Sequence, residues 1–459
     1  MDQGYPENKE LIISDKGEPV LKKTPAKVQP KGFAKLEAAL HAHMPEQHLL
    51  DILCRVDHWT TFTRHFGPLS GSDPKMEDAQ ARHILTTFAY ATNLGPAQMA
   101  RHLREGVTAE TLAHINRRHV TTEKLDAANR DIIDRFSKCI LPRCWGDEKR
   151  MATDGTQYDL AEENLLAEKH IRYGGYGGIA YHHVSDLYIL LFSHFIACGV
   201  WEATYIIDGL MKNHSAIQPN TVHADTQGQN LPVFALSYLL GIQLMPRIRN
   251  WKDLKLYRPS KETTYTHIDS LFHDDVIDWD LIKTHYQDLL RVVISIQEGK
   301  VLPSMLLRKL STYSRKNRLY QAFREVGCVV RTIFLLTFLS DAKLREIITA
   351  TTNKAEQYHA FSKWLHFGGE GKITATTPEE SEKRVKYNSL LANAVVLNNT
   401  LEMSAVLKDL AQEGYVLAKD ELAMLSPYQT QHIKRFGNYV IDLETLPQPI
   451  DDDELARLV

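Results

Sequence analysis

The chain has 459 residues, of which 43% are hydrophobic and 24% charged, which excludes a disordered chain and allows a large buried core. A formal net charge of −3 excludes a basic surface spread over the whole chain, so any nucleic-acid partner must be bound by local patches. Five scattered cysteines indicate a reducing compartment, and the most apolar run, 187–200, is too short to span a bilayer. We therefore expect a cytoplasmic protein that has no membrane partner.

The first third of the sequence predicts a lead-in followed by a helical domain. Residues 1–33 are polar and contain four prolines, which predicts a flexible lead-in with one short strand near 11–14. Across 34–147, apolar residues recur every three or four positions between turn signals such as Gly67-Pro68. This pattern predicts a helical scaffold domain.

The periodicity changes in the segment 148–258, where strands alternate with helices. Apolar and β-branched runs predict strands at 150–158, 179–184, 187–197, 221–224 and 242–248. The first three can form an antiparallel meander, whereas helices precede the last two, which should therefore be parallel. This order is that of an RNase H-like fold with a mixed five-stranded sheet.

The remaining sequence is mainly helical. We predict a helical insertion at 259–340, a core helix at 341–367, a loop at 368–378, C-terminal helices at 379–445 and an acidic tail at 446–459. The C-terminal helices include short ones near 419–425 and 428–436. The predicted fold class is thus α/β plus α: an RNase H-like core with a helical insertion, preceded and followed by helical regions.

Three carboxylates fall where this fold would bring them together. Asp154 lies in the first predicted strand, Asp225 at the end of the fourth, and Glu356 on the helix beyond the insertion. An Asp-Gly turn is the commoner explanation for Asp154 taken alone. Converging carboxylates raise one another's pKa unless cations neutralise them, so the set predicts two Mg²⁺ or Mn²⁺ ions. Spacing alone is weak support, because 57 acidic residues permit many such sets.

The residues around the three acids are more specific. Asp-Gly-Thr-Gln-Tyr at 154–158, His-Ala-Asp-Thr-Gln-Gly at 223–228 and Asn-Lys-Ala-Glu at 353–356 resemble the three DDE motifs of Tn3-family transposases. Further stretches resemble the same family in collinear order over roughly 35–445. The resemblance implies a catalytic half that nicks transposon DNA at its 3′ ends and transfers each strand to target DNA, with Asp154, Asp225 and Glu356 as catalytic metal ligands.

The resemblance also implies partners and boundaries. It implies that the chain binds transposon terminal inverted repeats and target DNA, as a homodimer on DNA and in association with the nucleoid. Family members are longer, and their modules that recognise the terminal repeats would precede residue 1. We therefore expect a fragment, a truncated reading frame or a free-standing catalytic half.

Basic residues near aromatic ones are candidates for contacts with the DNA backbone. The candidates are Arg247, Arg249, Lys252, Arg308, Lys309, Arg315, Lys316, Arg318 and Lys354. The stretch 301–324 holds six basic residues and no acid. A solvated helix face is the usual explanation for such a run, but beside a site that cleaves phosphodiesters DNA contact explains it equally well.

Two other functions stay open on the sequence. One is a non-catalytic DNA-binding or regulatory remnant of a transposase, which would bind DNA tightly without cleaving it. The other is a metal-dependent nuclease of RNase H-like fold, which would hydrolyse DNA without forming a joined product. His182, His183 and His194 fall on neighbouring predicted strands, but without a cysteine or acid at ligand spacing they do not predict a zinc site.

Overall fold

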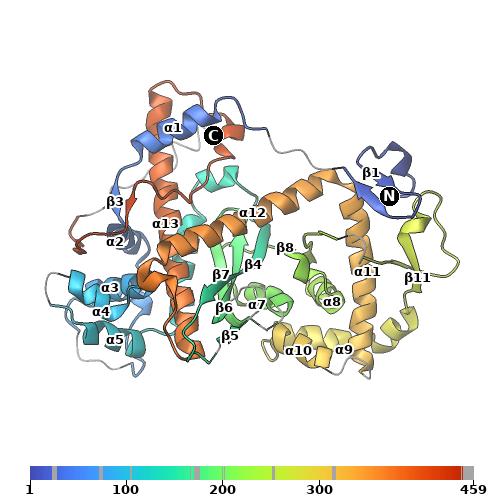
Figure 1. Cartoon of the computed structure of the whole chain (residues 1–459), viewed down its shortest axis with the longest axis horizontal. Helices are drawn as coiled ribbons and strands as arrows, with labels where there is room; N and C mark the ends of the chain where they lie inside the picture. The colour runs from blue at the N-terminus through green and yellow to red at the C-terminus, as the bar shows by residue number, and fades with distance from the viewer. Residues whose placement is uncertain are drawn as a thin grey trace.

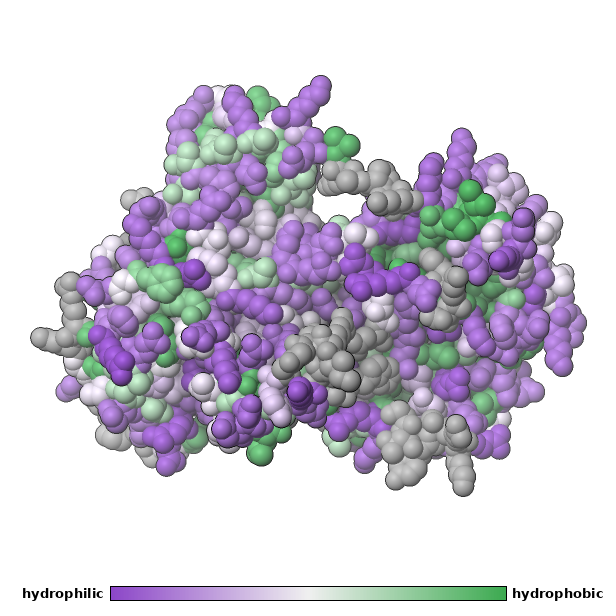
Figure 2. Space-filling view, viewed as in Figure 1, coloured by the Kyte–Doolittle hydropathy of each residue, from purple (hydrophilic) through white to green (hydrophobic). Residues whose placement is uncertain are grey.

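The computed structural model describes the chain apart from residues 23–27, 72–75, 104–105, 166, 170–175, 199, 201, 251–253, 313–316, 446 and 448–459. Three predicted DNA contacts, Lys252, Arg315 and Lys316, lie outside the described residues, as does the acidic tail except for residue 447. Figure 1 shows a central sheet with the N-terminal helices and α13 on one side and the insertion helices on the other. Hydrophobic side chains on this face form small, separate groups within a mainly hydrophilic surface (Figure 2).

The lead-in contains the short strand predicted near 11–14, together with a second strand that pairs with it. Strand β1 (Leu11–Ile13) pairs antiparallel with β2 (Pro19–Leu21), and this hairpin lies beside the insertion (Figure 1). The Asp2 carboxylate accepts hydrogen bonds from the backbone amides of Thr266 and His267, at 3.1 and 2.8 Å. These bonds fix the chain terminus to a distant loop, which prolines and polar residues alone do not reveal.

The predicted scaffold domain is helical and surrounds one long buried helix. Its helices are α1 (Phe33–His43), α2 (Leu49–Thr60), α3 (Ala79–Ala91), α4 (Gly95–His102), α5 (Ala109–Arg118) and α6 (Thr122–Phe136). Helix α13 (Pro378–Gln412) begins where the Thr377 hydroxyl accepts from the amide of Glu380. Among the described residues it is the helix long and apolar enough to cross a membrane, but 94% of its apolar window is buried, as in a core helix.

The sheet has the predicted strands in the predicted order. It is formed by β7 (Leu190–Ala197), β6 (Tyr176–Ser185), β4 (Arg150–Asp159), β8 (Thr221–Ala224) and β9 (Gln243–Leu244), in that spatial order. Strand β6 is antiparallel to β4 and β7, whereas β8 and β9 run parallel to β4. A short β5 (Glu168–Lys169) also pairs with β6. The crossovers are η4 (Glu202–Tyr205) with α7 (Ile206–Lys212), and α8 (Leu231–Leu239).

Strand β9 is shorter than the predicted segment 242–248, but its pairing continues beyond it. The amides of Met245 and Arg247 donate to the carbonyls of Val222 and Ala224, each at 2.8 Å. Alternate amides, those of Gln243, Met245 and Arg247, donate to the neighbouring chain, so Pro246 falls at a position that needs no donor and the ladder is unbroken. Arg247 is thereby held beside the end of β8.

The sequence did not predict a strand pair that joins the end of the predicted core segment, 148–258, to the predicted insertion, 259–340. The elements of this region are β10 (Leu256–Arg258), β11 (Phe272–Val276), α9 (Trp279–Gln297), α10 (Pro303–Thr312) and α11 (Arg318–Ser340). Strands β10 and β11 are parallel, so the helical prediction holds only from Trp279 onward. A Cβ on Gly327 would lie 2.1 Å from the Leu231 carbonyl oxygen, so this glycine lets α11 cross close to α8.

After the insertion the chain returns to the core. Helix α12 (Ala342–Leu365) is capped by Asp341, whose carboxylate accepts from the Leu344 amide at 3.0 Å. The C-terminal region adds the short α14 (Lys419–Leu422). The predicted helix at 428–436 is wrong, because this segment contains β12 (Ile433–Lys434), which pairs in parallel with β3 (Gln47–His48). Pairing with a strand far away in sequence overrides the local helical pattern.

Candidate active site

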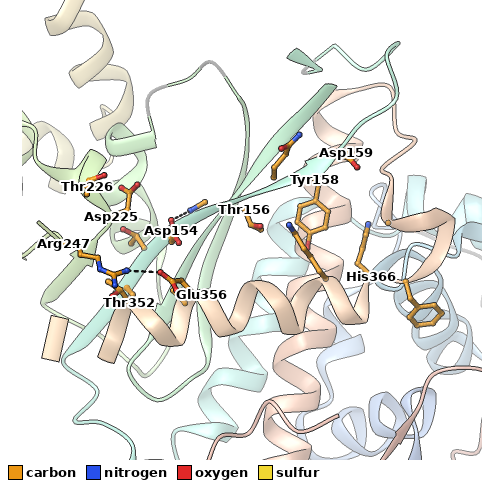
Figure 3. Close-up of a pocket in the computed structure, with 18 of the residues that line it drawn as sticks. Asp154, Thr156, Tyr158, Asp159, Asp225, Thr226, Arg247, Thr352, Glu356 and His366 are labelled. Atoms are coloured by element: carbon orange, nitrogen blue, oxygen red, sulfur yellow. Dashed lines mark hydrogen bonds and ion pairs between the residues drawn. The ribbon is translucent and has the colours of Figure 1, made fainter. Parts of the chain in front are cut away.

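The three predicted carboxylates line one cavity of about 750 Å³ where β4, β8 and α12 meet. In the parallel pairing of β4 with β8, Thr153 lies opposite Ala224, so Asp154 and Asp225 follow at the same level on adjacent strands. Figure 3 shows these two carboxylates close together, with Glu356 facing them from α12. Segments separated by 71 and 131 positions (225 − 154 and 356 − 225) thus contribute to one site.

The Asp154-Gly155 pair lies inside a continuous strand, so the turn explanation is wrong. It is paired with His182 and Tyr181 on β6. The Asp154 carboxylate accepts a hydrogen bond from the Gly155 amide at 2.9 Å. A Cβ at position 155 would lie 2.5 Å from the carboxylate oxygen of the buried Glu202, so only glycine allows this close approach.

Negative charge gathers around the phenol of Tyr181, which lies beneath the cavity. Burial is the main cause that raises the pKa of Tyr181 well above its ordinary value. The charges of Asp225, Glu202 and Asp154 raise this pKa further. Glu202 was not predicted from the sequence, because a single glutamate at the start of a predicted helix has no distinguishing neighbours.

The carboxylate of Glu356 forms an ion pair with an arginine that also lines the cavity. Its Oε1 lies 3.0 Å from Nη1 of Arg247, and its side chain is 54% exposed (Figure 3). In the part of the chain that the structure describes, no three histidine, cysteine, aspartate or glutamate side chains lie close enough to hold one metal ion. The donor set nevertheless fits Mg²⁺ or Mn²⁺, because hard carboxylate oxygens from three segments share one cavity. Only Oε1 of Glu356 is bound to Arg247 in this arrangement.

Two histidines, the buried His182 and the half-buried His359, lie behind Asp154. The ring centroids of His182 and His359 are 5.3 Å apart, and Nδ1 of His359 lies 3.9 Å from Asp154 Oδ2. Burial, with the nearby Lys363 charge, lowers the pKa of His359 to about 4, although a hydrogen bond to the Asp154 backbone opposes this shift. Burial also lowers the pKa of His182 well below its ordinary value. Both rings are therefore neutral near pH 7 and hold the strand and helix together without adding charge.

The predicted DNA contacts fall into separate groups. Arg247 and Arg249 line the cavity. Three further candidates lie on the exposed surface of the insertion helices: Arg308, Lys309 and Arg318. The candidates therefore divide into two that line the cavity and three that lie outside it, on the insertion.

Lys354 differs from the other candidates because its ammonium points into the protein. It donates to the carbonyl of Trp145 at 2.8 Å and to that of Asp186 at 2.6 Å. It also lies 4.5 Å from the centroid of the Tyr188 ring. These contacts fix α12 to the sheet, so Lys354 positions the helix that carries Glu356.

The sequence prediction missed two basic side chains that line the cavity, Lys363 and Arg435. Lys363 follows Glu356 by seven positions, two helical turns, so helical periodicity was a usable signal. Arg435 had no such signal, because its segment was assigned to a helix of its own.

Residues 51–439 match the family described as the Tn3 transposase DDE domain. The chain belongs to this family. It is 31% identical to the transposase for transposon Tn2501 from Escherichia coli over 435 residues, which cover 94% of this chain and 43% of that protein. Its identity to the transposase for transposon Tn1546 from Enterococcus faecium is 29% over 416 residues, or 90% and 42% of the two chains.

A further relative extends the same pattern. The transposase for transposon gamma-delta from Escherichia coli (strain K12) is 28% identical over 432 residues, covering 94% of this chain and 43% of the relative. The chain therefore spans less than half the length of these relatives. The matched DDE domain covers β4, β8 and α12, and thus all the cavity residues that carry the carboxylates.

Proposed function

We propose that this Tn3-family DDE domain cleaves and joins DNA strands in replicative transposition. It would nick the transposon at its 3′ ends and transfer each free 3′ strand to target DNA. The observation that supports this most directly is the shared cavity of Asp154, Asp225 and Glu356. The second strand of the sheet is antiparallel to the first, and two later strands run parallel to the first after helical crossovers. This strand order agrees with an RNase H-like core.

In this proposal the three carboxylates hold two divalent cations, Mg²⁺ or Mn²⁺. When bound, such ions lower the pKa of an attacking water or hydroxyl and stabilise charge on a phosphodiester oxygen. The pairing of β4 with β8 sets the positions of Asp154 and Asp225, whereas Glu356 would exchange its ion pair with Arg247 for a cation.

The basic side chains of the cavity would bind and orient the DNA backbone. Arg247, Arg249 and Lys363 line the same cavity as the acids, so a phosphate there meets both. A phosphate that engages Arg247 would at the same time free Glu356 from its ion pair. More distant backbone contacts would come from the exposed Arg308, Lys309 and Arg318 of the insertion, and two copies of the chain would act on paired ends.

The test supplies preformed end-DNA, nicked or branched, together with Mg²⁺ and the chain. Joined strand-transfer product should form with the wild type and be lost in Asp154→Ala. Asp159→Ala is the matched control, because Asp159 lies in the same cavity and on the same strand but outside the triad. Joining that persists in Asp154→Ala refutes the proposal, and hydrolysis without joining assigns a nuclease instead.

A further inference from the structure

An aromatic cluster with one arginine lies at the end of the cavity away from Asp154, Asp225 and Glu356. The Arg435 guanidinium carbon lies 4.2 Å from the ring centroid of Trp364, 5.4 Å from that of Phe367 and 5.3 Å from that of Phe436. The rings of Phe367 and Phe436 meet edge to face, with centroids 5.1 Å apart. Arg435 and Phe367 line the cavity itself, and Phe436 adjoins them.

This aromatic cluster (Trp364, Phe367, Arg435 and Phe436) is held in shape but is not part of the core. Phe436 is 66% exposed, although a phenylalanine at a packed position would be buried. Arg435 donates to the Trp364 carbonyl at 2.6 Å, and its own carbonyl accepts from the Tyr439 hydroxyl at 2.9 Å. Among the described residues, Arg435 forms no ion pair with a carboxylate. The cluster thus presents a fixed flat ring and a cation without an anionic partner.

The cluster lies within reach of a DNA strand bound at the acids. Helix α12 forms one wall of the cavity from Glu356 to its end at Leu365, a distance of about 14 Å at about 1.5 Å per residue. Figure 3 shows the same wall running from Glu356 toward His366, which lies beside the cluster. A strand whose phosphate lies at the carboxylates would therefore bring a nucleotide a few positions away to the aromatic cluster.

We propose that the aromatic cluster binds an unpaired nucleobase of the strand held in the cavity. The base stacks on the exposed face of Phe436, and the Arg435 guanidinium contributes a cation next to the adjoining phosphate. Stacking tolerates any base, so the site would hold the strand without reading its sequence. A large apolar partner surface fits less well, because Lys434, Gly437 and Asn438 beside Phe436 are exposed and not hydrophobic. The proposal rests on the proposed function, since it assumes a DNA strand in this cavity.

The test measures binding of single-stranded DNA by fluorescence anisotropy, without metal, to the whole chain. The probe is an oligonucleotide of about twelve nucleotides, and a matched strand has abasic sites at the same phosphate spacing. The wild type should bind the normal strand more tightly than the abasic strand. Phe436→Ala should weaken binding of the normal strand about fivefold to hundredfold and leave binding of the abasic strand unchanged.

Two control variants keep this test specific. Tyr286→Ala removes another exposed ring, 53% exposed on α9 and outside the cavity, and should leave both affinities unchanged. Phe436→Tyr keeps the stacking face and should bind like the wild type. Equal affinity for normal and abasic strands, or equal losses in Phe436→Ala and Tyr286→Ala, overturns the proposal. Asp154→Ala should bind the single strand like the wild type although it does not join DNA. Failure of the base-binding proposal and failure of the proposed function would therefore be seen in different assays, the first in strand binding and the second in strand transfer.

Discussion

The sheet and helix α12 place their carboxylates in different ways. Asp154 lies in β4 and Asp225 directly follows β8, so the parallel pairing of β4 with β8 fixes their separation. Glu356 lies half-exposed on a helix, and its carboxylate is bound to Arg247. One part of the site is therefore preset by the fold, while the other depends on how a helix and a side chain are held.

The insertion explains this difference. It separates β9 from α12, so the helix that carries Glu356 is joined to the sheet in sequence only through α9, α10 and α11. The insertion is in turn fixed to the core by the buried Asp208 on α7, which accepts from the amide and hydroxyl of Ser304 at 2.9 and 2.6 Å. The position of Glu356 should therefore respond to changes far from the cavity, whereas that of the aspartates should not.

The largest expected effect comes from the preset pair. Asp225→Asn keeps the shape of the side chain but removes the charge that a cation needs, so strand joining should fall about a thousandfold or more. Folding should be unchanged, because the neighbouring Val222 and Ala224 keep their places in the sheet. Joining assays and thermal unfolding measure the two effects. A loss of activity below tenfold would remove Asp225 from the proposed catalytic set.

The preset part of the site was also the part that the sequence predicted well. The strands around Asp154 and Asp225 have strong apolar patterns, and their pairing follows from helical crossovers that force parallel strands. The pair β10 and β11 was missed because β11 contains the exposed acids Asp274 and Asp275, which do not have a strand pattern. Arg435 was missed because its segment forms a pairing with residues almost 400 positions away.

The insertion gives the next largest effect. Asp208→Ala leaves the Ser304 amide and hydroxyl without their buried acceptor, so the free energy of unfolding should fall by about 3 kcal/mol. Strand joining should fall as well, because α10 leads through α11 to α12, but it should fall less than in Asp225→Asn, since the Lys354 contacts still hold α12. Urea denaturation measures the stability change. Asp280→Ala is the control, since Asp280 is 97% exposed and should change stability by less than about 0.5 kcal/mol. Equal stability of the two variants would contradict an anchoring role for Asp208.

A smaller effect is expected at the contact between the sheet and α12. The folded state lowers the pKa of His359 to about 4, from an ordinary value of 6.5. Between these values the unfolded state binds the proton and the folded state does not, so stability is lost as the pH falls. From about pH 6 to about pH 5, this residue should remove about 1 kcal/mol from the unfolding free energy. His359→Gln should reduce the pH dependence of the unfolding free energy by that amount, as measured by urea denaturation at pH 5 and pH 6. An unchanged dependence on pH would contradict this role of His359.

The smallest expected effect concerns the Arg247 bond itself. In Arg247→Ala, Glu356 loses the cation that holds it, so the DNA-free protein should bind Mg²⁺ or Mn²⁺ more tightly, by up to about fivefold for a partly exposed pair. Isothermal titration with the metal alone measures this change. Arg249→Ala also removes a positive charge from the cavity but leaves the ion pair intact, so it should raise the affinity less. Equal affinities in the two variants would mean that general charge, and not release of Glu356, governs metal binding. A larger gain in Arg247→Ala would mean that the ion pair sets the position of the third carboxylate until DNA arrives.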